Sequence, residues 1–455
     1  MGNLLNSLAT VADSMRATQL AIELAGNNVS NAKTPNFAKQ RLDLEARRFE
    51  VNRGLAGGVR AGSLISSRQD YLEQAVHEQN NRLGRFSQQT SDLERLEPIF
   101  DVSAGSGLGS TIDRLFESFS ALSVNPNDTP AREAVLARAR DLAQGFRLTA
   151  STIGSANSNA RSELSATVAA VNDIGAQIQK YNLEVRSDVR NLQDPGLEAG
   201  IYKQLEKLSE LVDFDTIRAE DGTFTVSLGG QTPLAVGASF FPISADVSPT
   251  GGGAILRNAQ GGEITGQIQQ GRLRGQLEQQ NGFLPALSAD LDRLSSTIAN
   301  AVNTVLAGGV DRDGNAPAQD LFIYDAARGA AATLAVNDLA PRELAAAEAD
   351  APGGNGNALT LADLSRSRLI DDYAVGQFYG SLAGRVGRTL ANARNDEHSQ
   401  TLLLAQARNL RATETEVSIN EEAANLVAFQ RQYEANAELI RILNSLTETT
   451  INLIR

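Results

Sequence analysis

Residues 426–454, which read LVAFQRQYEANAELIRILNSLTETTINLI, carry the pattern that decides the fold. Apolar or small side chains recur there at alternating steps of three and four residues, a mean period of about 3.5 that is typical of a coiled-coil seam. A surface helix of a globular domain would instead drift toward a period of about 3.6. The predicted seam positions are Leu426, Phe429, Tyr433, Asn436, Ile440, Leu443, Thr447, Thr450 and Ile454.

The first thirty residues repeat this pattern. Their seam positions are Leu4, Leu8, Val11, Met15, Thr18, Ile22, Ala25 and Val29. A single amphipathic helix often docks on the core of its own domain, and that interpretation stays open for either end. Two matched seams at opposite ends favour pairing, so we predict that residues 1–38 and 411–455 form a terminal coiled-coil domain.

A turn ends the first helix. Residues 30–41 read SNAKTPNFAKQR, in which Pro35 cannot continue a helix and Asn36 accepts a positive φ angle. We therefore predict a tight turn at Pro35, Asn36 and Phe37. The last helix has a strong start, with Asn420 as the expected N-cap and two glutamates in the first turn.

These segments resemble a known family. Residues 26–40, GNNVSNAKTPNFAKQ, are similar to the N-terminal signature of the flagellar axial proteins of the rod, hook and hook-associated groups. Residues 417–437, VSINEEAANLVAFQRQYEANA, resemble that family's C-terminal segment. Asn36 and Phe37 replace the usual glycine and tyrosine. Asparagine also tolerates a positive φ angle, and phenylalanine only lacks the hydroxyl, so the predicted turn should survive.

One branch of the family matches further. Residues 107–136 and 284–322 are similar to the first hook-associated proteins of the hook–filament junction. Flagellin, the nearest competitor, lacks the proline turn, and simple rod or hook proteins typically lack a helical tract like that between residues 70 and 210. The resemblance implies a secreted structural adaptor that joins hook to filament and is exported by the flagellar type III apparatus without a cleaved signal.

The same resemblance implies the partners: further copies of the chain in a ring or helical layer, hook protein, a second junction protein and an export chaperone. Because an apolar helix must be shielded before export, we expect the chaperone to bind Leu439, Ile442, Leu443 and Leu446. The alternative is a surface-displayed axial protein with an adhesion role, in which residues 212–270 are the recognition surface.

The middle of the chain, residues 39–410, is predicted to be mostly helical. Helical spacing predicts a long, mostly exposed helix over 70–97, helices over about 129–149 and 153–192, and further helices over 272–307 and 371–411. Residues 212–270 predict β hairpins, and 309–360 a loop-rich segment without the large outer β domain of longer family members. The fold class is therefore mainly α with a small β module.

Composition excludes several functions. Lys and Arg total 41 against 54 Asp and Glu, a net charge of −13 without a clustered basic surface, so nucleic acid is not an expected partner. The chain has no cysteine, which excludes disulfides and thiolate metal sites. No apolar run is long enough for membrane insertion, and the N-terminus lacks the basic region of a secretory signal.

Catalytic chemistry is also missing from the sequence. His77 and His398 lie far apart in polar surroundings and are expected to be exposed. Residues 311–315, DRDGN, begin like a calcium loop, but position twelve of that loop is Phe322 instead of glutamate, so a solvated turn is expected. We predict no catalytic, cofactor or metal site.

Overall fold

The computed structural model describes residues 2–50, 55–100, 107–247 and 253–454. The chain forms two compact units. The terminal unit comprises Met1–Arg82, Val171–Pro242 and Gln400–Arg455, and the core unit comprises Leu83–Ala170 and Ile243–Ser399. Both predicted terminal helices lie in the first unit. The predicted domain boundaries at residues 38 and 411 remain a proposal.

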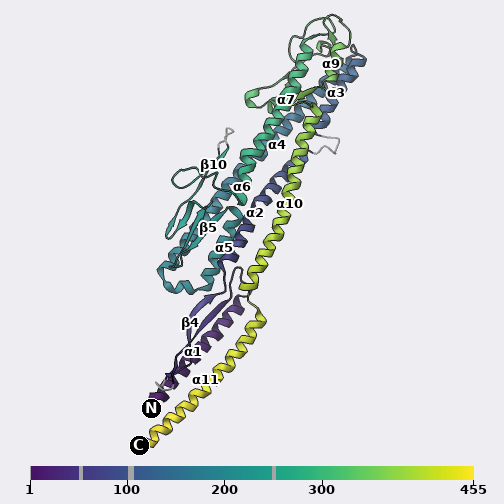
Figure 1. Cartoon of the computed structure of the whole chain (residues 1–455). Coiled ribbons are helices and arrows are strands. Elements are labelled where there is room, and N and C mark those ends of the chain that lie inside the picture. The colour runs from purple at the N-terminus through teal and green to yellow at the C-terminus, as the bar shows by residue number, and fades with distance from the viewer. Residues whose placement is uncertain (1, 51–54, 101–106, 248–252, 455) are drawn as a thin grey trace. The chain divides into compact units, whose positions relative to one another are not determined.

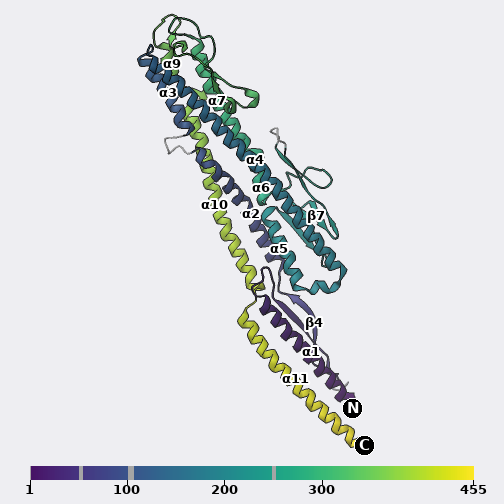
Figure 2. The same cartoon turned by 180° about the vertical axis from the view of Figure 1, so that it is seen from behind.

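Two long helices from opposite ends of the chain pair in the terminal unit. α1 (Gly2–Asn31) and α11 (Ile419–Ile454) lie side by side, as both views show (Figure 1, Figure 2). A two-stranded hairpin of β1 (Gln40–Ala46) and β4 (Val59–Ser66) packs on α1, and β2 (Phe49–Glu50) pairs with β3 (Leu55–Ala56). Gly58 approaches α1 so closely that a Cβ there would lie 2.3 Å from Thr10 Cγ2. This hairpin is not among the elements expected from the sequence.

The rest of the terminal unit joins helices to a four-stranded antiparallel sheet. α5 (Pro195–Leu211) precedes the sheet, whose order is β5–β6–β7–β8 (Phe214–Arg218, Phe224–Leu228, Thr232–Val236 and Ser239–Phe240). Asn182 is fully buried, donates to the carbonyls of Phe224 and Gly237, and accepts from the Phe224 amide. The predicted β hairpins are confirmed here.

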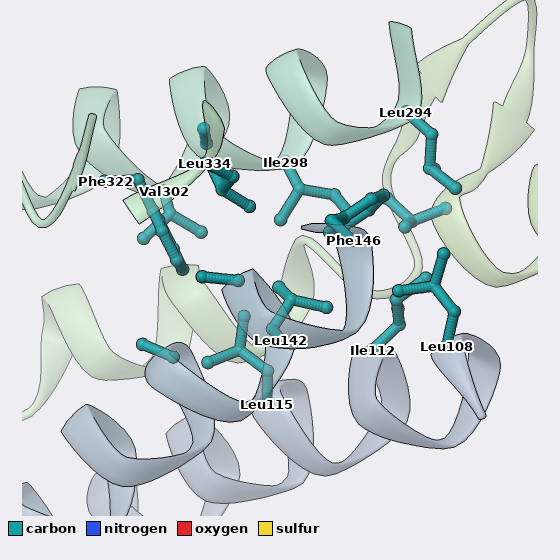
Figure 3. Packing of buried hydrophobic residues seen from close by; sticks show 14 of the residues in the cluster. Leu108, Ile112, Leu115, Leu142, Phe146, Leu294, Ile298, Val302, Phe322 and Leu334 are labelled. Atoms are coloured by element: carbon teal, nitrogen blue, oxygen red, sulfur yellow. The ribbon is translucent and has the colours of Figure 1, made fainter. Parts of the chain in front are cut away.

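The core unit buries one large apolar cluster (Figure 3). Its helices are α3 (Leu108–Val124), α7 (Leu284–Ala307), α9 (Gly356–Asp363) and the matching parts of α4 (Thr129–Ser187) and α10 (Val375–Thr415). Leucine and phenylalanine side chains interdigitate at its centre and exclude water. The labelled members are Leu108, Ile112, Leu115, Leu142, Phe146, Leu294, Ile298, Val302, Phe322 and Leu334.

Short elements complete the core unit. α6 (Gly271–Glu278) runs through a π-helical turn, Gln279–Phe283, into α7. Short antiparallel pairs and one short helix, α8, lie between the long helices. They are β9 (Ser244–Val247) with β10 (Ala254–Arg257), β11 (Gly309–Val310) with β14 (Ala347–Glu348), β12 (Phe322–Ile323) with β13 (Ala335–Val336), β15 (Arg368–Ile370) with β16 (Tyr373–Ala374), and α8 (Ala330–Thr333).

The predicted break near residue 150 was wrong, because α4 runs unbroken from Thr129 to Ser187. The expected helices over about 129–149 and 153–192 are parts of one helix, in which the Ser155 and Ser158 hydroxyls donate to carbonyls four residues back. The helix also ends before Leu192, and Val189–Gln193 forms a 3-10 helix.

Two further expectations need correction. α2 (Asp70–Leu96) is not mostly exposed, since Leu72, Val76, Leu93 and several polar side chains on it are buried. α11 begins at Ile419, and Ser418 instead of Asn420 caps it by accepting the Glu421 amide at 3.4 Å. The sequence of α2 has few apolar positions, which is typical of an exposed helix. Its polar side chains are buried because they pack against residues distant in sequence.

Candidate assembly surface

Two of the predicted seam positions on α1, Thr18 and Ala25, are buried, whereas most of the others on α1 and α11 are only half-buried. The half-buried members are Leu4, Leu8, Val11, Met15, Ile22, Val29, Leu426, Phe429, Tyr433, Ile440 and Leu443. The Ile454 side chain lies outside the described residues. Two helices can cover only part of each other's apolar surface, so this seam leaves apolar area exposed to solvent in a single chain.

A second apolar stripe lies on the solvent-facing side of α11. Leu439, Ile442 and Leu446 are 47%, 48% and 50% exposed and lie at helical spacing on one face of α11. We call these three residues the outer stripe. The structure therefore divides the predicted chaperone site, because Leu443 belongs to the half-buried seam and the other three belong to the outer stripe. Contiguous exposed apolar surface marks a protein interaction site more often than scattered single residues do.

The turn after α1 has the predicted backbone. Asn36 has a φ angle of 59°, the left-handed conformation expected from its similarity to the family's glycine. The Thr34 amide donates to the Asn31 carbonyl at 2.9 Å, and the Phe37 amide donates to the Thr34 carbonyl at 3.2 Å. Pro35 is exposed, whereas Phe37 is buried and anchors the turn.

Lys39 ties the residues after this turn to the start of α11. Its Nζ lies 2.9 Å from Glu421 Oε2 and 3.1 Å from Glu422 Oε1, and its amide donates to the Thr415 carbonyl at 2.9 Å. Burial disfavours the charged ammonium, but the hydrogen bonds and charges of both glutamates outweigh burial and raise the pKa of Lys39. The glutamates that the sequence assigned to the helix dipole therefore also form ion pairs.

Buried ion pairs hold the other side of the turn. Arg68 donates to the Asn36 carbonyl at 2.6 Å, pairs with Glu73, and stacks 3.9 Å from the centre of the Tyr202 ring. Arg411 on α10 contacts Glu73 at 3.0 Å and Glu206 on α5 at 3.2 Å, and Arg408 contacts Glu206 at 2.9 Å. We call Arg68, Glu73, Glu206, Arg408 and Arg411 the arginine network.

The arginine network fixes where the chain leaves the helix pair. Burial alone would raise the pKa of Glu206, but Arg411 and Arg408 outweigh burial and lower it. Sequence reasoning missed the network because isolated charges on polar helices usually lie in solvent. The available signal was spacing: Glu73, Val76, His77 and Asn80 share one face of α2, and that face is buried.

His77 corrects an expectation. It is buried, with its ring 5.4 Å from the Phe214 ring, and burial lowers its pKa to about 4 despite the nearby charges of Glu73 and Glu206. The neutral ring packs as an aromatic side chain. His398 is exposed, as expected.

No group of acidic or histidine side chains within the described parts of the chain is arranged to hold a metal ion. The Asp311 carboxylate accepts the amides of Asp313 at 2.8 Å and Asn315 at 2.7 Å, so it closes its own turn. Asp311 itself is buried, whereas the expectation was a solvated turn. Among the described helices, none combines the length and apolar character of a membrane span.

Comparison with known families defines first the class of protein. Residues 414–453, which hold all of α11 except its last residue, match the family described as "Flagellar basal body rod FlgEFG protein C-terminal". This segment of the chain is therefore similar to the C-terminal part of flagellar rod proteins. Residues 93–322, half of the chain, match "Flagellar hook-associated protein FlgK helical domain". The chain therefore belongs to the FlgK family of flagellar hook-associated proteins, and the predicted resemblance is confirmed.

Individual relatives agree with this assignment. The chain is 25% identical to flagellar hook-associated protein 1 of Bacillus subtilis, across 98% of this chain and 97% of that protein. It is 20% identical to flagellar hook-associated protein 1 of Escherichia coli, with full coverage of both. The solved flagellar hook junction protein FlgK of Burkholderia pseudomallei covers 77% of this chain with a TM-score of 0.67 and 15% identity, so the fold is shared.

Proposed function

We propose that this chain is the structural adaptor that joins the flagellar hook to the filament, acting outside the cell after export. The observation that carries the proposal is the match of half the chain to the helical domain of the flagellar hook-associated family. The predicted fold class, mainly α with paired terminal helices, is also what the structure has.

The adaptor works through the geometry of its terminal helices. Neighbouring copies would cover the half-buried seam and the outer stripe, so that α1 and α11 of many chains pack into an inner layer. Burial of apolar surface stabilises by roughly 25 cal/mol per Å², but a single chain must first order both helices. The arginine network and Lys39 then hold the turn in one direction in every copy, which a regular layer requires.

The proposed partners follow from this role. They are further copies of the chain, the hook protein, a second junction protein, and an export chaperone that covers the outer stripe before assembly. The outer stripe supplies the apolar anchors that helix-in-groove recognition needs, at Leu439, Ile442 and Leu446.

Deletion of the gene is the direct test of the adaptor. Cells should then carry bare hooks and release filament protein into the medium, and the wild-type gene should restore filaments. Normal filaments on the deletion strain would contradict the proposal.

The rival adhesion role makes a different prediction. Removing residues 214–240, the four-stranded sheet, should leave filaments intact and abolish surface binding if that sheet is a recognition surface. Loss of filaments in a variant that is still exported at normal levels favours the adaptor.

A further inference from the structure

A groove of about 530 Å³ lies in the core unit, and none of the residues that the structure describes fills it. One wall is a face of α4, the other is the start of α7, and the segment leading into α8 closes one end. Buried Ile153, Leu284 and Leu291 supply an apolar part of its lining, which we call the floor. The lining also includes three charged residues, Arg161, Asp292 and Arg328, so two of its three charges are positive.

Three features of this groove are suited to a ligand. A Cβ added at exposed Gly154 would meet no atom within 4 Å, so space for a large side chain is open there. Gln280 is only 3% exposed; its Nε2 donates to Asn157 Oδ1 at 2.6 Å, but its Oε1 has no partner within the described residues. Arg161, one helical turn beyond Asn157, forms no ion pair with any described residue, and its buried Nε is also without a partner.

The backbone supports a specialised role at this site. Gln280 lies in the π-helical turn Gln279–Phe283, a rare conformation that is frequent at functional sites. Asn281 in the same turn is occupied, because its amide binds both backbone groups of Ala254. Gln280 Oε1 is therefore a buried acceptor in this turn that no described residue satisfies.

A complementary projection lies elsewhere on the same unit. The hairpin between β15 and β16 turns through Asp371 and Asp372, with φ angles of 44° and 63°. Such a turn normally uses asparagine and glycine, and here Arg293 holds it by two contacts of 2.5 Å to the Asp371 carboxylate. Asp372 forms no ion pair with a described residue, and the neighbouring Tyr373 is 48% exposed. We call residues 371–373 the acidic knob.

We propose that the acidic knob of one copy docks in the groove of a second copy. The Tyr373 ring would cover the apolar floor, its hydroxyl would donate to Gln280 Oε1, and the Asp372 carboxylate would pair with Arg161. This inference rests on the proposed function, since it names a contact within the assembled layer. The two surfaces are different patches of one unit, so the contact is heterologous, the type that builds rings and helical layers.

The size of the contact determines where it forms. One tyrosine buries about 150–250 Å², far below the roughly 1,200 Å² of a stable complex. This contact by itself is therefore too small to hold two purified chains together. The acidic knob docks only when other contacts in the assembled layer already hold the copies close to each other.

Cross-linking in isolated flagella tests the contact. A strain without the native gene makes two variants together, Gly154→Cys and Asp372→Cys, whose thiols are the only ones in this protein because the chain has no cysteine. A short bis-maleimide should join the two variants into a dimer. In the matched control, Gly387→Cys replaces Gly154→Cys, because Gly387 is also an exposed helical glycine with open space around its Cβ.

The outcomes separate this proposal from the adaptor function. Dimers with Gly154→Cys and none with Gly387→Cys support the docking. The docking is overturned if cells that carry filaments give equal dimer yields with the two glycine variants, or no dimer at all. It is also overturned if residue 154 is linked to a different protein. Absence of the wild-type chain from isolated flagella contradicts the adaptor function instead.

Charge reversal gives an independent readout. Arg161→Asp and Asp372→Arg should each reduce the fraction of cells with filaments, and the two changes combined should restore it. Single variants that assemble normally, or a combined variant no better than either, would contradict the pairing of these two residues.

Discussion

The core unit and the helix pair of the terminal unit use similar apolar residues in different ways. In the core unit, Phe119, Leu142 and Phe146 are fully buried by other parts of the same chain. On α11, Phe429 and Leu443 remain half-buried and Leu446 is half exposed. The core unit therefore buries its apolar centre within one chain, whereas the helix pair leaves apolar surface that, under the proposed function, further chains would bury.

Matched phenylalanine truncations give the largest contrast. Phe146→Ala should lower the free energy of unfolding by about 3–5 kcal/mol, because it leaves a cavity in a closed core. Phe429→Ala should lower that of the monomer by less than about 1 kcal/mol, yet remove filaments from cells. Urea unfolding of purified monomers and filament counts measure the two effects. If both variants lowered the free energy of unfolding of the monomer by similar amounts, the contrast between the core unit and the helix pair would be wrong.

Acid should act on the two units with opposite signs. His77 in the terminal unit has a pKa of about 4, below its ordinary 6.5, so the unfolded chain binds the proton more tightly. Acidification from pH 6.5 to 4 then lowers the free energy of unfolding of the terminal unit by up to about 3 kcal/mol. Glu73, Glu206, Arg411 and Arg68 surround the ring.

Asp92 in the core unit behaves in reverse. Burial raises its pKa to about 6, with Gln88, Glu163 and Arg95 as the neighbouring groups. The folded state binds this proton more tightly, so acidification from pH 6 to 3.8 stabilises the core unit by up to about 3 kcal/mol. Urea titrations between pH 7.5 and 4 measure the free energy of unfolding. On acidification this free energy should fall less in His77→Gln than in the wild type. Asp92→Asn should raise it at pH 7.5 but not at pH 4. Parallel pH profiles for both variants and the wild type would refute these assignments.

The turn at residue 36 should produce a smaller effect. Asn36→Gly keeps the φ angle of 59° available, whereas Asn36→Val places a β-branched residue in the left-handed region at a cost of about 1–2 kcal/mol. The assembled layer repeats this strain in every copy, so filament attachment should fail before the monomer melts. Normal motility with valine would show that this turn does not set the direction of the chain.

The outer stripe should have the smallest effect on the monomer. Leu446→Asp should change monomer stability by no more than about 0.5 kcal/mol, because the side chain is half exposed, but it should abolish chaperone binding. Leu443→Asp should abolish binding as well, whereas exposed Ser445→Asp serves as the control. Unchanged affinity for the two leucine variants, measured by calorimetry, would place the chaperone site elsewhere.

Periodicity predicted the parts of the fold that depend on local spacing. The paired helices at both ends and the hairpins after Asp213 follow from side-chain patterns, and the Asn36 conformation follows from its similarity to the family's glycine. The break expected near residue 150 was wrong because serine side chains can bond back to their own helix. His77 and the arginine network were missed because burial of a polar residue depends on partners distant in sequence: Glu73 meets Arg411 across 338 residues.

Hydrogen exchange of the purified monomer and of assembled flagella tests most directly whether the helix pair is completed by other chains. The account predicts that amides of Gly2–Asn31 and Ile419–Ile454 exchange much faster than those of Leu284–Ala307 in the monomer, and become protected on assembly. Equal protection of the three helices in the monomer, unchanged in flagella, would contradict it.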